Sequence, residues 1–125
     1  MTRIASGLCL VSVLFLVGCG IFPAKFDSTE YGSLVRIESM SEQGQCTPEY
    51  VQRMKDEVVY VKHYAHHTPN NEETYESIKL IDESIDTLLK RVQQIPVTPL
   101  YCTMKMQYIQ TETRILLDAV GKKPR

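Results

Sequence analysis

The sequence lacks an excess of either charge. It has 14 Lys and Arg residues against 15 Asp and Glu residues, for a formal net charge of -1 at pH 7. A nearly neutral chain produces no strong positive field, so the composition argues against a nucleic-acid partner. Long apolar runs are also missing from the chain that follows the N-terminal segment. No run in that part approaches the ~20 residues that cross a bilayer.

The sequence also lacks the motifs that commonly carry catalysis. It contains no Gly-x-Ser-x-Gly elbow, no glycine-rich phosphate loop and no cysteine and histidine in a catalytic context. Three carboxylate pairs are adjacent in sequence: Asp56-Glu57, Glu72-Glu73 and Asp82-Glu83. Adjacent residues diverge on a helix, whereas acid and base catalysis needs carboxylates that converge. We therefore predict solvated helix faces at these pairs, no enzymatic activity and no cofactor.

An uncharged apolar run from Ile4 to Val17 follows the single basic residue Arg3. At roughly 14 residues the run is shorter than a membrane-spanning helix requires, and it suits the apolar region of a signal peptide. Cys9 lies inside this run as a small apolar residue, and it is expected to leave with the signal. The segment therefore predicts export.

The apolar run closes with Leu16-Val17-Gly18-Cys19, which resembles the lipobox of bacterial lipoprotein precursors. The resemblance implies cleavage of residues 1–18, a thioether bond from Cys19 to diacylglycerol, and acylation of the new amino group, for example with palmitate. Gly20 in place of aspartate resembles the pattern that permits sorting to the outer membrane. We therefore expect a lipid anchor in the outer membrane and a domain that faces the periplasm. A plain secretory signal or an uncleaved short anchor is the alternative.

The mature chain is expected to have three parts. Residues 19–27 are the lipidated cysteine and a short tether, residues 28–121 are one helical domain, and residues 122–125 are a basic tail. So short a tether holds the domain close to the membrane surface. The tail is expected to be solvated.

Three segments carry the signals of long helices, at about 48–67, 71–94 and 99–120. Two of them begin at a Thr-Pro pair, which supplies a capping hydroxyl and a residue that needs no N–H bond. Gly121 is expected to cap the last helix. Apolar residues recur within the segments at steps of three and four. They are Val51, Met54, Val58, Val61 and Ala65, then Tyr75, Ile78, Ile81, Ile85, Leu88 and Val92, then Cys102, Met106, Ile109, Leu116 and Val120.

The signals for a shorter N-terminal helix over about 28–41 are mixed. Asp27 and Glu30 have the spacing of a capping box, in which Asp27 accepts from backbone N–H groups and Glu30 reaches back. Gly32 weakens this helix, and Leu34 to Ile37 also fits a short strand. The sequence leaves open whether the segment joins the other helices or lies along the membrane.

Cys46 and Cys102 remain in the expected mature domain. Exported proteins meet an oxidising compartment, so the two thiols are expected to pair. Helices joined by short loops alternate in direction, which places the starts of 48–67 and 99–120 at one end. Cys46 precedes the first of these starts and Cys102 lies just inside the second. The sequence thus predicts an all-α fold, a small antiparallel helical bundle stapled by a Cys46–Cys102 disulfide.

Three histidines are weak candidates for a metal site. His63, His66 and His67 are spaced so that His63 and His67 share a helical face, as metal ligands often do. A closed site needs further ligands that the sequence does not indicate. Histidines in the last turn of a helix also interact favourably with its dipole, so we predict no metal site here.

The chain has seven tyrosines and no tryptophan. Tyr60, Tyr64, Tyr101 and Tyr108 fall on or beside the apolar stripes, where amphipathic rings suit a partner surface. The simpler interpretation, which we favour, places them at the edge of the core with their hydroxyls toward water.

These features favour a non-enzymatic interaction module at the cell envelope, bound to the membrane through lipid on Cys19 and to an envelope protein. A first alternative is a phage or plasmid lipoprotein that acts in lysis, like an outer-membrane spanin, or in superinfection or entry exclusion. A second is a metal-handling periplasmic lipoprotein that uses His63 and its neighbours. The sequence does not identify the partner, the process or the oligomeric state.

Overall fold

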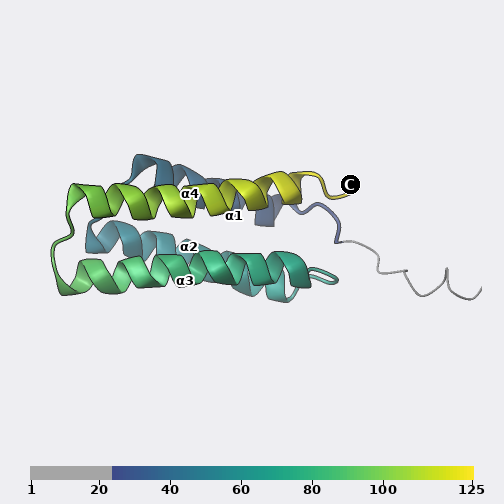
Figure 1. The fold of residues 1–125 in the computed structure, drawn as a ribbon. Coiled ribbons are helices and arrows are strands. Elements are labelled where there is room, and N and C mark those ends of the chain that lie inside the picture. The colour runs from purple at the N-terminus through teal and green to yellow at the C-terminus, as the bar shows by residue number, and fades with distance from the viewer. Residues whose placement is uncertain (1–23) are drawn as a thin grey trace, which may run out of the picture.

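The computed structural model describes residues 24–125, so the expected signal peptide and Cys19 lie outside the described residues. It contains four helices: α1 (Ser28–Gln43), α2 (Pro48–His66), α3 (Glu72–Gln94) and α4 (Pro99–Gly121). They alternate in direction and lie side by side (Figure 1). We call the end where α1 begins and α4 ends the near end, and the end where α2 begins and α3 ends the far end. The described residues form no strand, so the predicted all-helical fold is confirmed.

Helix α1 is a full member of the bundle and contacts both α2 and α4. Leu34 and Ile37 are fully buried in the shared core, so the alternative of a short strand is wrong. The helix runs to Gln43, beyond the expected end, and stops where Gly44 takes a left-handed backbone with a φ of 68°. Glycine adopts that conformation without the steric cost that a side chain brings.

The helix starts follow the predicted capping at α2 and α4. Thr47 and Thr98 each accept a hydrogen bond from the backbone N–H three residues on, at 3.2 Å. The prediction for Gly121 is wrong, because this residue is still helical and Lys122 follows with a φ of -89°. Asn71 precedes α3, but its side chain makes no capping bond.

The core is continuous along the four helices, and the predicted apolar stripes of α2, α3 and α4 all face it. Its fully buried side chains include Leu34, Ile37, Met54, Ile78, Ile81, Ile85, Leu88 and Ile109. The Cys46–Cys102 disulfide is present at the far end and joins the α1–α2 loop to the first turn of α4, with Cα atoms 5.9 Å apart. Among residues 24–125, no helix is long and apolar enough to cross a membrane.

Candidate functional site

A buried polar network closes the near end of the bundle. Glu30 is fully buried, and Lys123 donates to its Oε1 at 2.9 Å while Asn71 donates to its Oε2 at 2.5 Å. The Lys123 ammonium also donates to Asn71 Oδ1 at 2.7 Å. The network thus joins the start of α1, the α2–α3 loop and the C-terminal tail.

Two predictions for this end of the domain are therefore wrong. Glu30 does not reach back to complete a capping box, because its carboxylate points inward to Lys123. The tail is not simply solvated, since Lys123 lies in the network. The end of the expected tether also packs on the domain: Ala24 is buried and the Phe26 N–H donates to the Pro124 carbonyl at 2.8 Å.

Asp27 links this network to α2. Its Oδ1 accepts from the Thr29 and Glu30 N–H groups, at 2.8 Å and 3.0 Å, as predicted for the cap. Its Oδ2 accepts from the Tyr64 hydroxyl at 2.7 Å, so that hydroxyl is bonded to protein and is not directed to water. Burial raises the pKa of Asp27, but these hydrogen bonds outweigh it and the pKa lies below its ordinary value of 3.8.

Every buried side-chain nitrogen or oxygen among the described residues has a hydrogen-bond partner. The polar side chains of the near end are therefore paired within the domain, and their hydrogen bonds stabilise the fold. We interpret the near end as a structural lock, in which the N-terminal start of α1 and the C-terminal tail are held together.

A second ionic cluster lies between α2 and α3. The Asp82 carboxylate is largely buried and pairs with Lys55, at 2.5 Å, and with Lys62. The prediction of a solvated face at Asp82-Glu83 is therefore wrong for Asp82. Burial raises the pKa of Asp82, but the hydrogen bonds from the two lysines outweigh it, so the pKa lies below 3.8.

The lowered pKa of Asp82 predicts a specific loss of stability in acid. A group with a depressed pKa stabilises the fold fully above its unfolded pKa, and that contribution disappears as the pH falls through the folded value. We expect the free energy of unfolding to fall from about pH 5 toward about pH 2, and Asp82→Asn to reduce this fall. Urea unfolding across that range measures it. The matched control, Asp56→Asn, alters an exposed carboxylate and should leave the slope unchanged.

The histidines gather at the near end of α2. The ring centroids of His63 and His67 are 4.6 Å apart, and the His66 ring lies 4.8 Å from that of Tyr75. Within residues 24–125, no three His, Cys, Asp or Glu side chains are grouped so that they could hold one metal ion. The arrangement brings the predicted pair together without the further ligands that a closed metal site requires.

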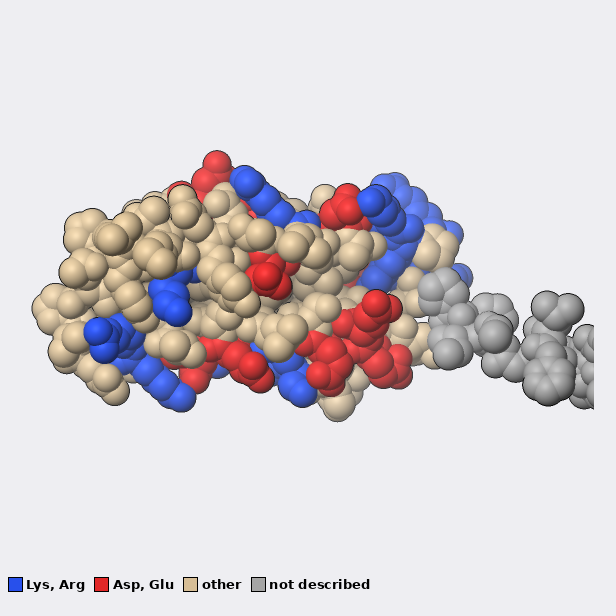
Figure 2. Space-filling view, viewed as in Figure 1, with Lys and Arg blue, Asp and Glu red and all other residues tan. Residues whose placement is uncertain are grey.

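Two grooves lie away from the polar lock. The far-end groove is bordered by the disulfide and by the α3–α4 connection, and its apolar lining includes Val92, Ile95 and Val97. Ile95 is 46% exposed. Figure 2 shows uncharged residues covering much of the visible face toward this end.

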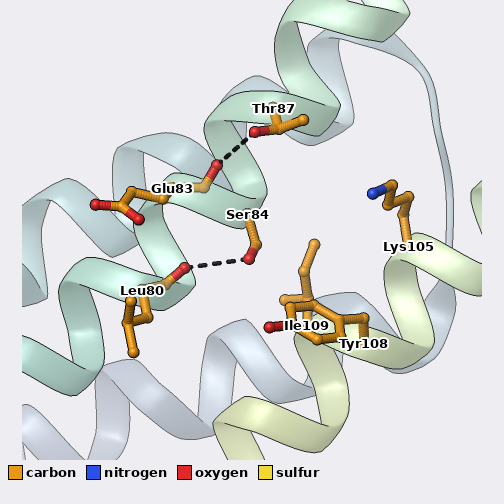
Figure 3. A pocket seen from close by; sticks show the side chains of 7 residues that line it. All are labelled: Leu80, Glu83, Ser84, Thr87, Lys105, Tyr108 and Ile109. Atoms are coloured by element: carbon orange, nitrogen blue, oxygen red, sulfur yellow. Dashed lines mark hydrogen bonds between the residues drawn. The ribbon is translucent and has the colours of Figure 1, made fainter.

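The second groove lies between α3 and α4 (Figure 3). The two hydroxyls that α3 contributes are engaged within that helix, because Ser84 donates to the Leu80 carbonyl at 3.1 Å and Thr87 donates to the Glu83 carbonyl at 2.9 Å. The surface that the groove exposes to solvent is mainly apolar, because Leu80 and Tyr108 are both more than half exposed. Such a surface suits contact with another protein better than chemistry.

The described chain is thus a four-helix, disulfide-bonded domain with a locked near end and apolar grooves elsewhere. No family model, curated protein or solved structure matches it. Sequence periodicity pointed to neither groove, because most of the residues that line each groove lie outside the principal buried stripes.

Proposed function

We propose that this chain is a bacterial envelope lipoprotein, anchored by lipid on Cys19, whose helical domain is a non-enzymatic interaction module. The observation that carries this proposal is the exposed apolar lining of the far-end groove, beside the disulfide. An exposed apolar surface of this kind is costly in water and is typical of a site that binds another protein.

Distances along the chain support a partner near the membrane. Ala24 already packs on the domain, so the link from Cys19 to Ala24 spans at most about 17 Å when fully extended. Helix α4 has 23 residues and is about 35 Å long, which separates the far end from the near end. A partner bound at the far-end groove therefore lies within a short distance of the bilayer and is itself an envelope protein.

The anchor is tested by replacing its cysteine. In a Gram-negative host, Cys19→Ser should abolish incorporation of labelled palmitate and release the protein from the membrane fraction. Cys9→Ser alters a cysteine within the expected signal and should leave both properties unchanged. Retention of palmitate by Cys19→Ser would refute the lipid anchor.

The interaction module is tested by pull-down from membranes with identification of the bound protein. Ile95→Asp places a charge in the far-end groove and should reduce recovery of the partner about tenfold or more. Val59→Asp introduces the same charge at an exposed apolar position on α2 and should leave recovery unchanged. Equal recovery by both variants would place the binding surface elsewhere.

A further inference from the structure

Helix α4 has a second apolar stripe, on the side opposite the core. Leu100, Met104, Tyr108 and Ile115 recur at helical spacing and are between 54% and 70% exposed. Thr111 is also exposed and lies between Tyr108 and Ile115, so the stripe carries no charge. A helix that is apolar on two faces has a second face to bury.

Two charges beside the stripe have no ion-pair partner among the described residues. Within α4, Arg114 pairs with Glu38 at 2.7 Å and Asp118 pairs with Lys122 at 2.6 Å. Lys105 and Glu112 form no salt bridge in residues 24–125. They are two helical turns apart and lie on the α3 side of the stripe, where Lys105 borders the groove with Tyr108 (Figure 3).

We infer that the stripe binds a second copy of this chain, with the two α4 helices packed antiparallel about a twofold axis near the middle of the helix. In that register, Met104 of each copy faces Ile115 of the other, and the two Tyr108 rings lie near the axis. Lys105 of each copy then meets Glu112 of the other. The symmetry makes this ion pair twice.

Charge self-complementarity is what selects a second copy, and the antiparallel direction, as the occupant. An isologous contact requires a surface that matches itself under a twofold rotation, and a lysine and a glutamate placed symmetrically about the helix centre satisfy this. In a parallel pairing, Lys105 would face Leu100 and Glu112 would face Gln107, so neither charge would find a partner.

The dimer does not depend on the proposed lipid anchor or on the far-end groove. It does have a consequence for the anchor, because antiparallel α4 helices place the near ends of the two copies at opposite ends of the pair. Two copies tethered in one membrane would therefore hold the dimer with its long axis along the surface.

Charge reversal in trans tests the inference. Two differently tagged copies of the full chain are co-expressed, one is captured from detergent-solubilised whole cells, and recovery of the other is measured. Lys105→Glu in both copies, or Glu112→Lys in both, creates like-charge contacts twice and should lower recovery about tenfold or more. Glu42→Lys, an exposed reversal at the far end of α1, should leave recovery unchanged.

The decisive sample pairs one copy carrying Lys105→Glu with another carrying Glu112→Lys. Both contacts are then of opposite charge, so recovery should return to the wild-type level. That rescue also shows that the two variants are folded. Failure to recover wild-type copies together, insensitivity to either reversal, or absence of rescue would each overturn the antiparallel α4 dimer.

Discussion

Replacement of both Cys46 and Cys102 by serine is expected to lower the free energy of unfolding by about 4 kcal/mol. The two residues are 56 positions apart, so the bridge closes a loop that contains the whole of α2 and α3. By the chain-entropy model, the bridge removes conformations from the unfolded chain, and the loss of entropy grows with the logarithm of loop length. Domains of this size are commonly stable by only about 5–15 kcal/mol, so the change decides how much of the protein is folded.

Urea unfolding followed by circular dichroism measures this effect. The serine variant should unfold at lower urea, and its transition should be steeper, because an uncrosslinked chain exposes more surface when it unfolds. Wild-type protein treated with a reductant is the matched control and should behave as the variant does. An unfolding midpoint that is the same with and without reductant would contradict the prediction.

Helices α2, α3 and α4 were predictable because each has a local start signal and an apolar stripe that faces the core. The sequence predicted helix α1 less clearly, and there is a physical reason for this. Its buried face includes Glu30, Ser33 and Ser41 beside Leu34 and Ile37, so its apolar pattern is weak. Tertiary packing and the hydrogen bonds of these polar residues stabilise the helix although its buried face has few apolar residues.

The ionic contacts were not predictable, because they join residues that are distant in sequence. Asp82 looks like any other acidic residue on a helix until the register of α2 against α3 places Lys55 and Lys62 beside it. The second stripe of α4 was missed for a different reason. Leu100 and Met104 are apolar like the core residues Cys102 and Met106 of the same helix, and only their exposure in the folded domain separates the two faces.

The basic tail provides the second large prediction, because only one of its two lysines belongs to the buried network. Lys123 is 14% exposed and bonds to the buried Glu30, whereas Lys122 is 73% exposed and bonds only to Asp118. Lys123→Met keeps an apolar stem but leaves the Glu30 carboxylate without its cation. Breaking one partner of a buried ion pair costs about 3 kcal/mol or more. Lys122→Met removes an exposed pair, which contributes about 0.5 kcal/mol or less.

Comparison of the two methionine variants by urea unfolding isolates burial as the cause, since both make the same substitution in adjacent residues. A third variant, Glu30→Gln with Lys123→Met, removes both charges and should regain much of the stability lost by Lys123→Met alone. That recovery would identify the unpaired carboxylate, and not the lost lysine stem, as the source of the loss. Equal destabilisation by Lys122→Met and Lys123→Met would instead mean that the tail contributes no specific contact and that the near end is held by the remaining helix contacts.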